Sequence, residues 1–181
     1  MLNGYTKKCG RVRAGVKQLL LIQAPDFKGA TFDTADEDAV SAVSFAENSH
    51  FMVYEFQEDE CQYEENFKTE NGIHAVEQKI TFKLPGMTPE TRRAVQEIAD
   101  ASYCGLIGAV IRPDGNILVG FDKEFDKLRP LKLETTTGTT GKALTDSSGE
   151  EVVLSRTSTE KAPYYIGDAK ALTGEAVSVG D

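Results

Sequence analysis

Residues 77–111, EQKITFKLPGMTPETRRAVQEIADASYCGLIGAVI, contain a strand pattern, a helix pattern and a second strand pattern in direct succession. In the first part Ile80, Phe82 and Leu84 alternate with polar residues, which predicts a strand with one buried face. The last part, 106–111, returns to the apolar composition of a strand. We therefore expect sheets that pack around one connecting helix.

The middle of this stretch predicts a single helix over about 88–104. Thr88 has the side chain of an N-terminal cap, and Gly105 can end the helix in the left-handed conformation. Small and apolar side chains recur at helical spacing and form a narrow stripe: Ala94, Val95, Ile98, Ala99 and Ser102. We expect the helix to pack on a sheet through Val95 and Ile98.

Runs of apolar, aromatic and β-branched residues predict the strands. These runs lie at 16–22, 50–57, 75–84, 106–111, 116–121, 131–135, 143–145, 150–155 and 164–166. The polar segment 25–48 predicts a long loop with at most one short strand near 42–45, and the glycine- and threonine-rich segment 135–141 predicts a flexible linker. Together the elements indicate a mainly β fold, an antiparallel β-sandwich or barrel with one flanking α-helix.

The length of the chain suits one domain, because 181 residues can bury a substantial hydrophobic core. We expect a single β-sandwich domain over 1–181. Two parts of this domain differ in composition from the rest. They are a basic N-terminal arm at about 1–15 and a C-terminal tail of small residues at about 167–181.

Charge is distributed unevenly along the chain. An acidic segment predicts a long hairpin loop over about 58–72, which ends in the turn signal Asn71-Gly72. The acids concerned are Glu58, Asp59, Glu60, Glu64 and Glu65, and the bases of the N-terminal arm are Lys7, Lys8, Arg11 and Arg13. These residues are candidates for contacts between subunits or for the lining of a lumen, because complementary charges steer association and fix its register. Alternatively, both segments are simply solvated.

The overall composition excludes several classes of protein. The net charge of −9 argues against tight binding of nucleic acid, which requires a basic surface. Cys9, Cys61 and Cys104 are odd in number and widely spaced, which favours free thiols over a disulfide framework. The sequence shows neither a membrane-spanning apolar run nor a signal-peptide pattern, so we expect a protein of the cytoplasm or of a particle assembled there.

No motif predicts catalytic or cofactor-binding chemistry. His50 and His74 are the only histidines, and no recognisable carboxylate spacing supplements them as metal ligands. The segment GTTGK at 138–142 departs from the phosphate-binding loop pattern, because Ala143 stands where a serine or threonine is required. The hydrolase elbow and the zinc-protease motif are also missing from the sequence. We expect no enzyme, no cofactor and no metal site.

The order of the expected elements resembles that of the tail tube proteins of tailed bacteriophages. In both, strands and a long polar hairpin loop precede one helix and further hairpins. The resemblance spans 77–165 and is strongest in the opening stretch and in RPLKLETTTGTTGKALTDSSGEEVVL at 129–154. These segments are similar to small virion proteins from phages and prophages of Bacteroides-type bacteria.

The resemblance implies a structural subunit that forms hexameric rings, which stack into a hollow tube. DNA would pass through the tube without specific binding. The implied partners are further copies and other phage tail or connector proteins, with no membrane. The implied location is the tail of the virion, assembled in the cytoplasm of the bacterial host.

Other functions would give a similar sequence pattern. A tail terminator or a head–tail joining protein belongs to the same class of virion component. A carbohydrate- or host-surface-binding β-sandwich module and a small enzyme on a β scaffold are alternatives from other classes.

Overall fold

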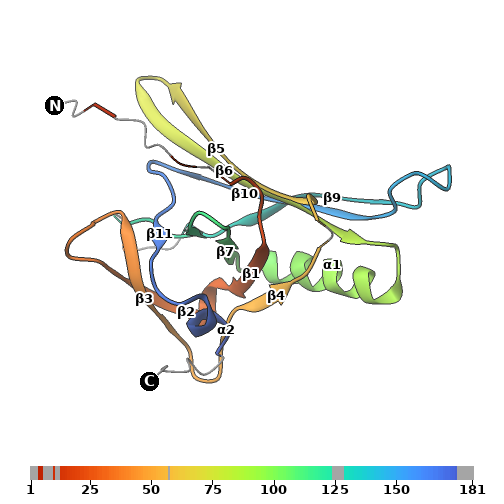
Figure 1. Cartoon of the computed structure of the whole chain (residues 1–181), viewed down its shortest axis with the longest axis horizontal. Coiled ribbons are helices and arrows are strands. Elements are labelled where there is room, and N and C mark those ends of the chain that lie inside the picture. The colour runs from red at the N-terminus through yellow and green to blue at the C-terminus, as the bar shows by residue number, and fades with distance from the viewer. Residues whose placement is uncertain (1–3, 6–9, 11–12, 57, 124–128, 175–181) are drawn as a thin grey trace.

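The computed structural model describes residues 4–5, 10, 13–56, 58–123 and 129–174. Lys7, Lys8 and Arg11 of the basic arm lie outside these residues. The described chain is mainly β, with two sheets and one longer helix, α1 (Pro89–Ser102), beside them (Figure 1). The predicted fold class is confirmed, and the form is that of two open sheets, because neither closes into a barrel.

The two sheets differ in size and in strand composition. The larger has the order β2-β3-β11-β8-β7-β1-β4 and contains β1 (Gln18–Gln23), β2 (Phe27–Phe32), β3 (Ala39–Phe45), β4 (Met52–Tyr54), β7 (Leu106–Ile111), β8 (Asn116–Val119) and β11 (Tyr164–Tyr165). The smaller has the order β5-β6-β10-β9 and contains β5 (Cys61–Glu70), β6 (Ile73–Pro85), β9 (Lys132–Thr139) and β10 (Gly149–Ser158). Two short helical segments, η1 (Ala24–Asp26) and α2 (Ala169–Thr173), complete the set. None of the described helices is long and apolar enough to cross a membrane.

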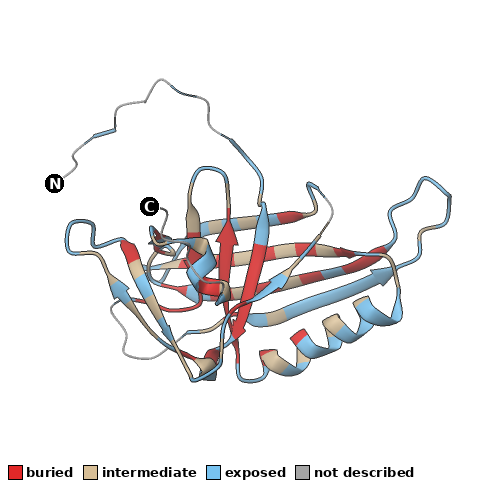
Figure 2. Cartoon of the chain, turned by 60° about the horizontal axis from the view of Figure 1, so that its bottom comes forward, coloured by how far each residue is buried: buried red, intermediate tan, exposed pale blue. Residues whose placement is uncertain are grey.

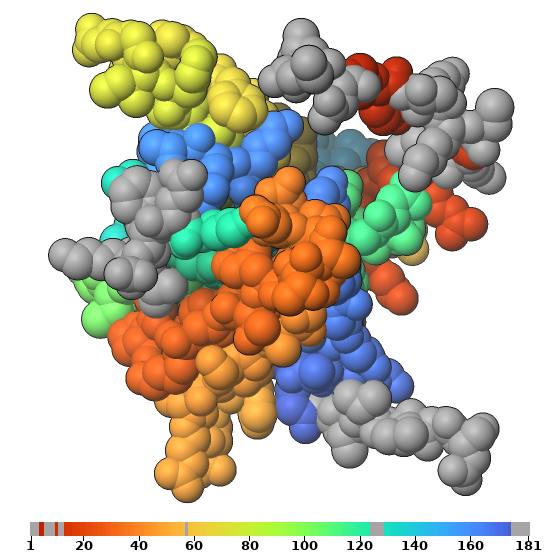
Figure 3. Space-filling model, turned by 90° about the vertical axis from the view of Figure 1, so that its left-hand side faces the viewer, coloured from red at the N-terminus to blue at the C-terminus, as the bar shows by residue number. Residues whose placement is uncertain are grey.

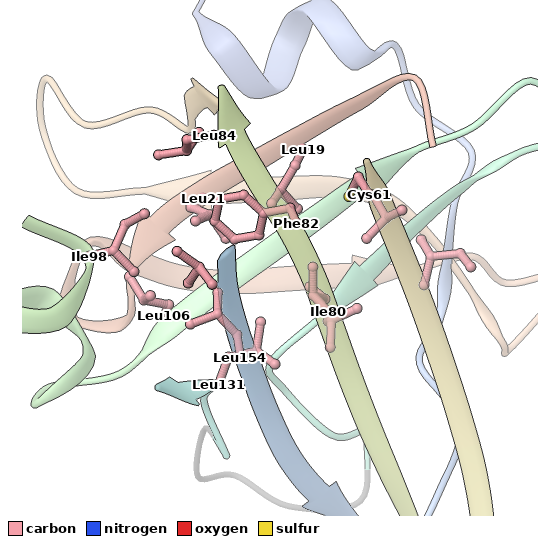
Figure 4. Packing of buried hydrophobic residues seen from close by; sticks show 14 residues of the cluster. Leu19, Leu21, Cys61, Ile80, Phe82, Leu84, Ile98, Leu106, Leu131 and Leu154 are labelled. Carbon is pink, nitrogen blue, oxygen red and sulfur yellow. The ribbon is translucent and has the colours of Figure 1, made fainter. Parts of the chain in front are cut away.

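Strand β1 is buried on both faces and separates two hydrophobic clusters. Leu19 and Leu21 point toward the smaller sheet and join the cluster that contains Phe82 of β6 (Figure 4). Leu20 and Ile22 point the other way, into a cluster that includes residues of β3, β7, β8 and α2. The apolar run at 16–22 is continuous because side chains on both faces of this strand are covered.

Strand β6 has the predicted alternation. Ile80, Phe82 and Leu84 are buried, whereas the lysines and the threonine between them are partly exposed. The paired strand β10 contributes Val152 and Leu154 to the same cluster. The smaller sheet therefore has one apolar face that packs on the core and one polar face that does not.

The predicted helix is confirmed together with its caps. The Thr88 side chain accepts a hydrogen bond from the backbone N–H of Thr91, and the Thr91 side chain accepts one from the backbone of Thr88. Gly105 has φ +96°, the left-handed conformation that ends a helix. Ile98 is 1% exposed, and Val95 packs against the same cluster, so the helix uses the predicted face.

The acidic segment is a strand and not a loop, so the predicted long hairpin loop at 58–72 is wrong. Only Asn71 and Gly72 form the turn, with φ of +52° and +76°, as a tight two-residue hairpin requires. Cys61 and Tyr63 of this strand lie on the inner face of the sheet, opposite Phe82 and Ile80. The acidic residues around them had suggested a loop. The polar composition of this segment led to the prediction of a loop because a strand with one exposed face needs few apolar residues.

Three further predictions are corrected by the structure. The supposed loop at 25–48 contains β2 and β3, which pair with each other. The supposed linker at 135–141 mostly belongs to β9, which pairs with β10, and the predicted strand at 143–145 lies in the loop between these two strands. The tail at 167–181 contains α2, which Asp168 caps and which buries Leu172, while residues 175–181 lie outside the described part of the chain.

A buried ion pair joins the two sheets. Arg156 of β10 contacts the carboxylate of Asp122, which follows β8, and donates a hydrogen bond to the carbonyl of Phe121 at 3.2 Å. The Ser158 hydroxyl donates to the same carboxylate at 2.6 Å. Burial lowers the pKa of Arg156, and the charge of Asp122 opposes that shift. The pair is a buried polar link between layers that are held mainly by apolar contacts.

Replacement of Ile98 by alanine should reduce the free energy of unfolding by about 2–4 kcal/mol, because it removes buried methyl groups and leaves a cavity. Urea denaturation followed by circular dichroism measures this change. Arg93→Ala, on the exposed side of α1, is the control and should leave stability nearly unchanged. A loss below about 0.5 kcal/mol for Ile98→Ala would contradict this packing.

Replacement of Asp122 by alanine should cost about 3–5 kcal/mol, because it leaves the buried guanidinium of Arg156 without its counter-charge. The same denaturation assay measures the loss. Glu37→Ala, which breaks an exposed ion pair with Lys123, is the matched control and should change stability little. Equal behaviour of the two variants would show that the buried pair does not hold the sheets together.

Candidate assembly surface

The outer face of the smaller sheet is polar and carries no described layer over it. The strand register places alternate residues of β5, β6, β9 and β10 on this face. Its charged residues are Glu64, Glu70, Glu77, Glu134 and Glu151, and Lys68, Lys79, Lys83 and Lys132. The acids on this face outnumber the bases by one, so most of the acidic excess of the chain lies elsewhere.

Two cross-strand ion pairs neutralise part of this face. The Lys68 ammonium lies 2.5 Å from the Glu77 carboxylate, and that of Lys79 lies 3.3 Å from Glu134. The Lys68 ammonium lowers the pKa of Glu77, and the Glu77 carboxylate raises the pKa of Lys68. The lysines concerned are thus partly engaged within the sheet.

Both edges of the smaller sheet are open among the described residues, because β5 and β9 each pair with one strand only. The Lys83 N–H donates to the Glu60 carbonyl at 3.0 Å, which marks a hydrogen-bonded pair at the start of β5. Since such pairs alternate along an antiparallel ladder, the odd-numbered residues of β5 direct their backbone groups to the open edge. Long open edges are sites for pairing with another strand.

The smaller sheet extends beyond the core at both ends. The β5–β6 hairpin stands out from the surface (yellow-green at the upper left of Figure 3), with Phe67 and Ile73 exposed near its tip. At the other end the exposed β9–β10 loop projects (right of Figure 2), with Leu144 fully exposed. The Asp146 carboxylate accepts two backbone hydrogen bonds of 2.8 Å in this loop, which lower its pKa. Apolar side chains on projecting elements suit contacts with other molecules.

The predicted charged residues that the structure describes, Arg13 and the five acids, do not form one patch. Arg13 donates its backbone N–H to Asp114 at 2.6 Å, and its side chain is exposed. Glu58 and Asp59 are exposed before β5, far along the strand from the hairpin tip, and Glu60 is partly buried there. Glu64 lies on the outer face of the sheet.

Glu65 faces inward and binds within its own chain. Its carboxylate accepts hydrogen bonds from the Tyr63 hydroxyl at 2.6 Å and from the Ala162 N–H at 2.9 Å. Burial and then this hydrogen bond raise the pKa of Tyr63 well above its usual range. Through the bond to Ala162, Glu65 holds the segment before β11 against β5.

The two histidines and the glycine-rich segment make contacts within the fold. His50 stacks edge-on against Phe45, and His74 shares a 2.9 Å hydrogen bond with Thr69. Gly138 is a strand residue opposite Glu150. Within the described ranges, no three histidine, cysteine, aspartate or glutamate side chains are grouped to hold a metal ion.

A groove that sequence reasoning missed lies between the larger sheet and α1. It encloses about 560 Å³ and is lined by β1, β4, the turn before β4 and the last turns of α1. Cys104 is exposed at this groove, whereas Cys61 is buried and its thiol pKa is raised by desolvation to about 12. The lining residues are too far apart in the sequence for any motif to group them.

Comparison with known proteins yields little. No protein family and no curated protein matches the chain. One solved structure, titled "Structure of the Phage P2 Baseplate in its Activated Conformation with Ca", contains a chain that aligns with 76% of this one at 13% identity and a TM-score of 0.28. The present chain spans 43% of that chain, less than half of its length. A TM-score this low establishes neither a shared fold nor a shared role.

The two described thiols should differ in reactivity. Iodoacetamide at mildly alkaline pH should modify Cys104 in the folded protein and leave Cys61 unmodified, because a buried thiol with a raised pKa forms little thiolate. Peptide mass spectrometry reports each site separately. Cys61 should react once urea unfolds the chain, and its rapid modification in the native state would contradict its burial.

Proposed function

We propose that this chain is a non-enzymatic structural subunit that assembles with its own copies into stacked rings, as the tail tube of a phage virion. The observation that carries the proposal is the smaller sheet, which has two long open edges and one polar face that packs on nothing described. The resemblance of the sequence to tail tube proteins supplies the class of assembly.

The edges of the sheet support a ring in particular. β5 and β9 are different strands, so pairing β5 of one copy with β9 of the next is a heterologous contact. Repeated heterologous contacts close into a ring when their rotation permits. A continuous sheet in the ring satisfies the backbone groups that a single copy leaves open.

The dimensions of such a ring fit a conduit. Six copies with four strands each give a wall of 24 strands. At a strand spacing of about 4.8 Å, opposite backbones lie about 37 Å apart for upright strands and about 48 Å apart for strands tilted by about 40°. Inward side chains take about 5 Å on each side, which leaves a bore wide enough for a DNA duplex.

The outer face of the smaller sheet would line the ring, and its charges suit the passage of DNA without binding. Tight binding of DNA requires cations that displace the counterions of several phosphates. Here five glutamates accompany four lysines, and two of the lysines are held in ion pairs. The lack of a net positive charge would keep DNA from adhering to this face.

The projecting hairpin and loop would contact adjacent rings or other tail and connector proteins, within a virion tail assembled in the bacterial cytoplasm. A tail terminator or joining protein would use the same sheet edges and differ in the end product. A host-surface-binding module would use exposed side chains and would need no ring.

Thr69→Pro should abolish ring formation, because proline removes a backbone donor that faces the open edge of β5. The monomer should remain folded, since the internal β5–β6 bonds use the neighbouring residues. Thr69→Ala is the matched control, because it also loses the contact with His74 but keeps the backbone N–H. Negative-stain microscopy and sedimentation velocity measure the assemblies.

The wild-type protein should form rings and tubes, and the alanine variant should do the same. Rings that never stack would favour the terminator or joining role. A wild-type protein that stays monomeric at high concentration, or a proline variant that assembles normally, would overturn the proposal.

A further inference from the structure

The groove between β4 and α1 has an apolar floor and an open strand beside it. Leu21 and Ile22 of β1, Tyr54 of β4 and Ala101 of α1 line it. β4 is the last strand of the larger sheet, and its Met52 is 66% exposed. An extended peptide laid beside β4 would pair with this edge and cover that side chain.

The charged side chains that line this groove are all acidic. Its lining includes the carboxylates of Asp26, Glu97 and Asp100 and contains neither lysine nor arginine. Burial raises the pKa of the Tyr54 phenol and the Glu97 carboxylate adds to the shift, so these two groups lie close together. A segment that occupies the groove should therefore be cationic, with some apolar side chains.

We propose that the groove binds the N-terminal segment, residues 1–12, of a second copy of this chain. This inference rests on the proposed self-assembly and names the contact that stacks one ring on the next. The segment contains Lys7, Lys8 and Arg11 and no acid, together with Leu2 and Tyr5 as apolar residues. Its charge complements the rim of the groove, and its length of up to about 40 Å exceeds the length of β4.

The positions of the arm and the groove favour a second copy over the same chain. The Arg13 backbone is tied to Asp114 in the β7–β8 turn, which places the start of the arm beside the first residue of β1. The groove lies at the other end of β1, beside Gln23, about 20 Å away. Within one chain about six residues nearest Arg13 would be needed to span this distance, so Lys7, Lys8 and Arg11 could not lie in the groove. The segment starts at one end of β1 and the groove lies at the other end. The contact between two copies is therefore head-to-tail, and it can repeat along a stack.

The native cysteines provide a direct test. Cys9 lies in the segment and Cys104 lines the groove, so mild oxidation of the assembled protein should join them into a disulfide between two chains. A mixture of Cys9→Ser and Cys104→Ser chains should give cross-linked dimers that contain one chain of each kind. Each variant alone should lose this product. Cross-linking within one chain, or equal dimer yields from each variant alone, would overturn the proposal.

Charge neutralisation tests the groove without cysteine chemistry. The double variant Glu97→Gln/Asp100→Asn should form rings that no longer stack, as should a chain that lacks residues 1–12. The matched control Glu58→Gln/Asp59→Asn removes two exposed charges before β5 and should stack normally. Stacking lost in the control and kept in the groove variant would instead make those acids the partner of the arm.

These outcomes separate this inference from the proposed function. If the wild-type protein forms no rings, the proposed self-assembly fails. If rings form and stack equally well without residues 1–12, the assembly stands and the contact between arm and groove is wrong.

Discussion

The burial of β1 on both faces is the constraint on which the rest of the structure depends. Leu19 and Leu21 require a second sheet on one side, and Leu20 and Ile22 require cover on the other. Each fully buried side chain of this kind contributes about 1.5–3 kcal/mol. Exposure of either face of β1 would forfeit two such contributions, so the strand obliges the chain to form two layers around it.

This arrangement decides what the smaller sheet can offer to other molecules. Its inner face is committed to β1 and α1, with Ile80 and Phe82 at 0% exposure. The outer face and both edges are left free among the described residues because the core needs only one side of the sheet. The same strand can therefore stabilise the fold through one set of side chains and present polar ones to a neighbour through the alternate set.

Sequence patterns predicted the elements in which buried residues recur at regular spacing or in which the chain carries a clear cap. The alternation in β6 and the caps of α1 appear in the structure as predicted. Prediction failed where one face of a strand is exposed, as in β5 and β9, since their polar and threonine-rich composition matches that of loops. The groove was beyond prediction because Tyr54, Glu97 and Cys104 come together only through the packing of α1 on the sheets.

The positions of the acids change the meaning of the charge pattern. From the sequence, the densest acidic run is the expected partner of the basic arm. In the fold most of that run is a strand, and its Glu65 binds within its own chain. The carboxylates of Glu97 and Asp100 stand instead beside an apolar floor and an open strand edge. Electrostatic attraction orients partners, while apolar burial and strand pairing hold them. A surface that combines all three is a better receptor for a cationic segment than a solvated row of acids, which supplies only the first.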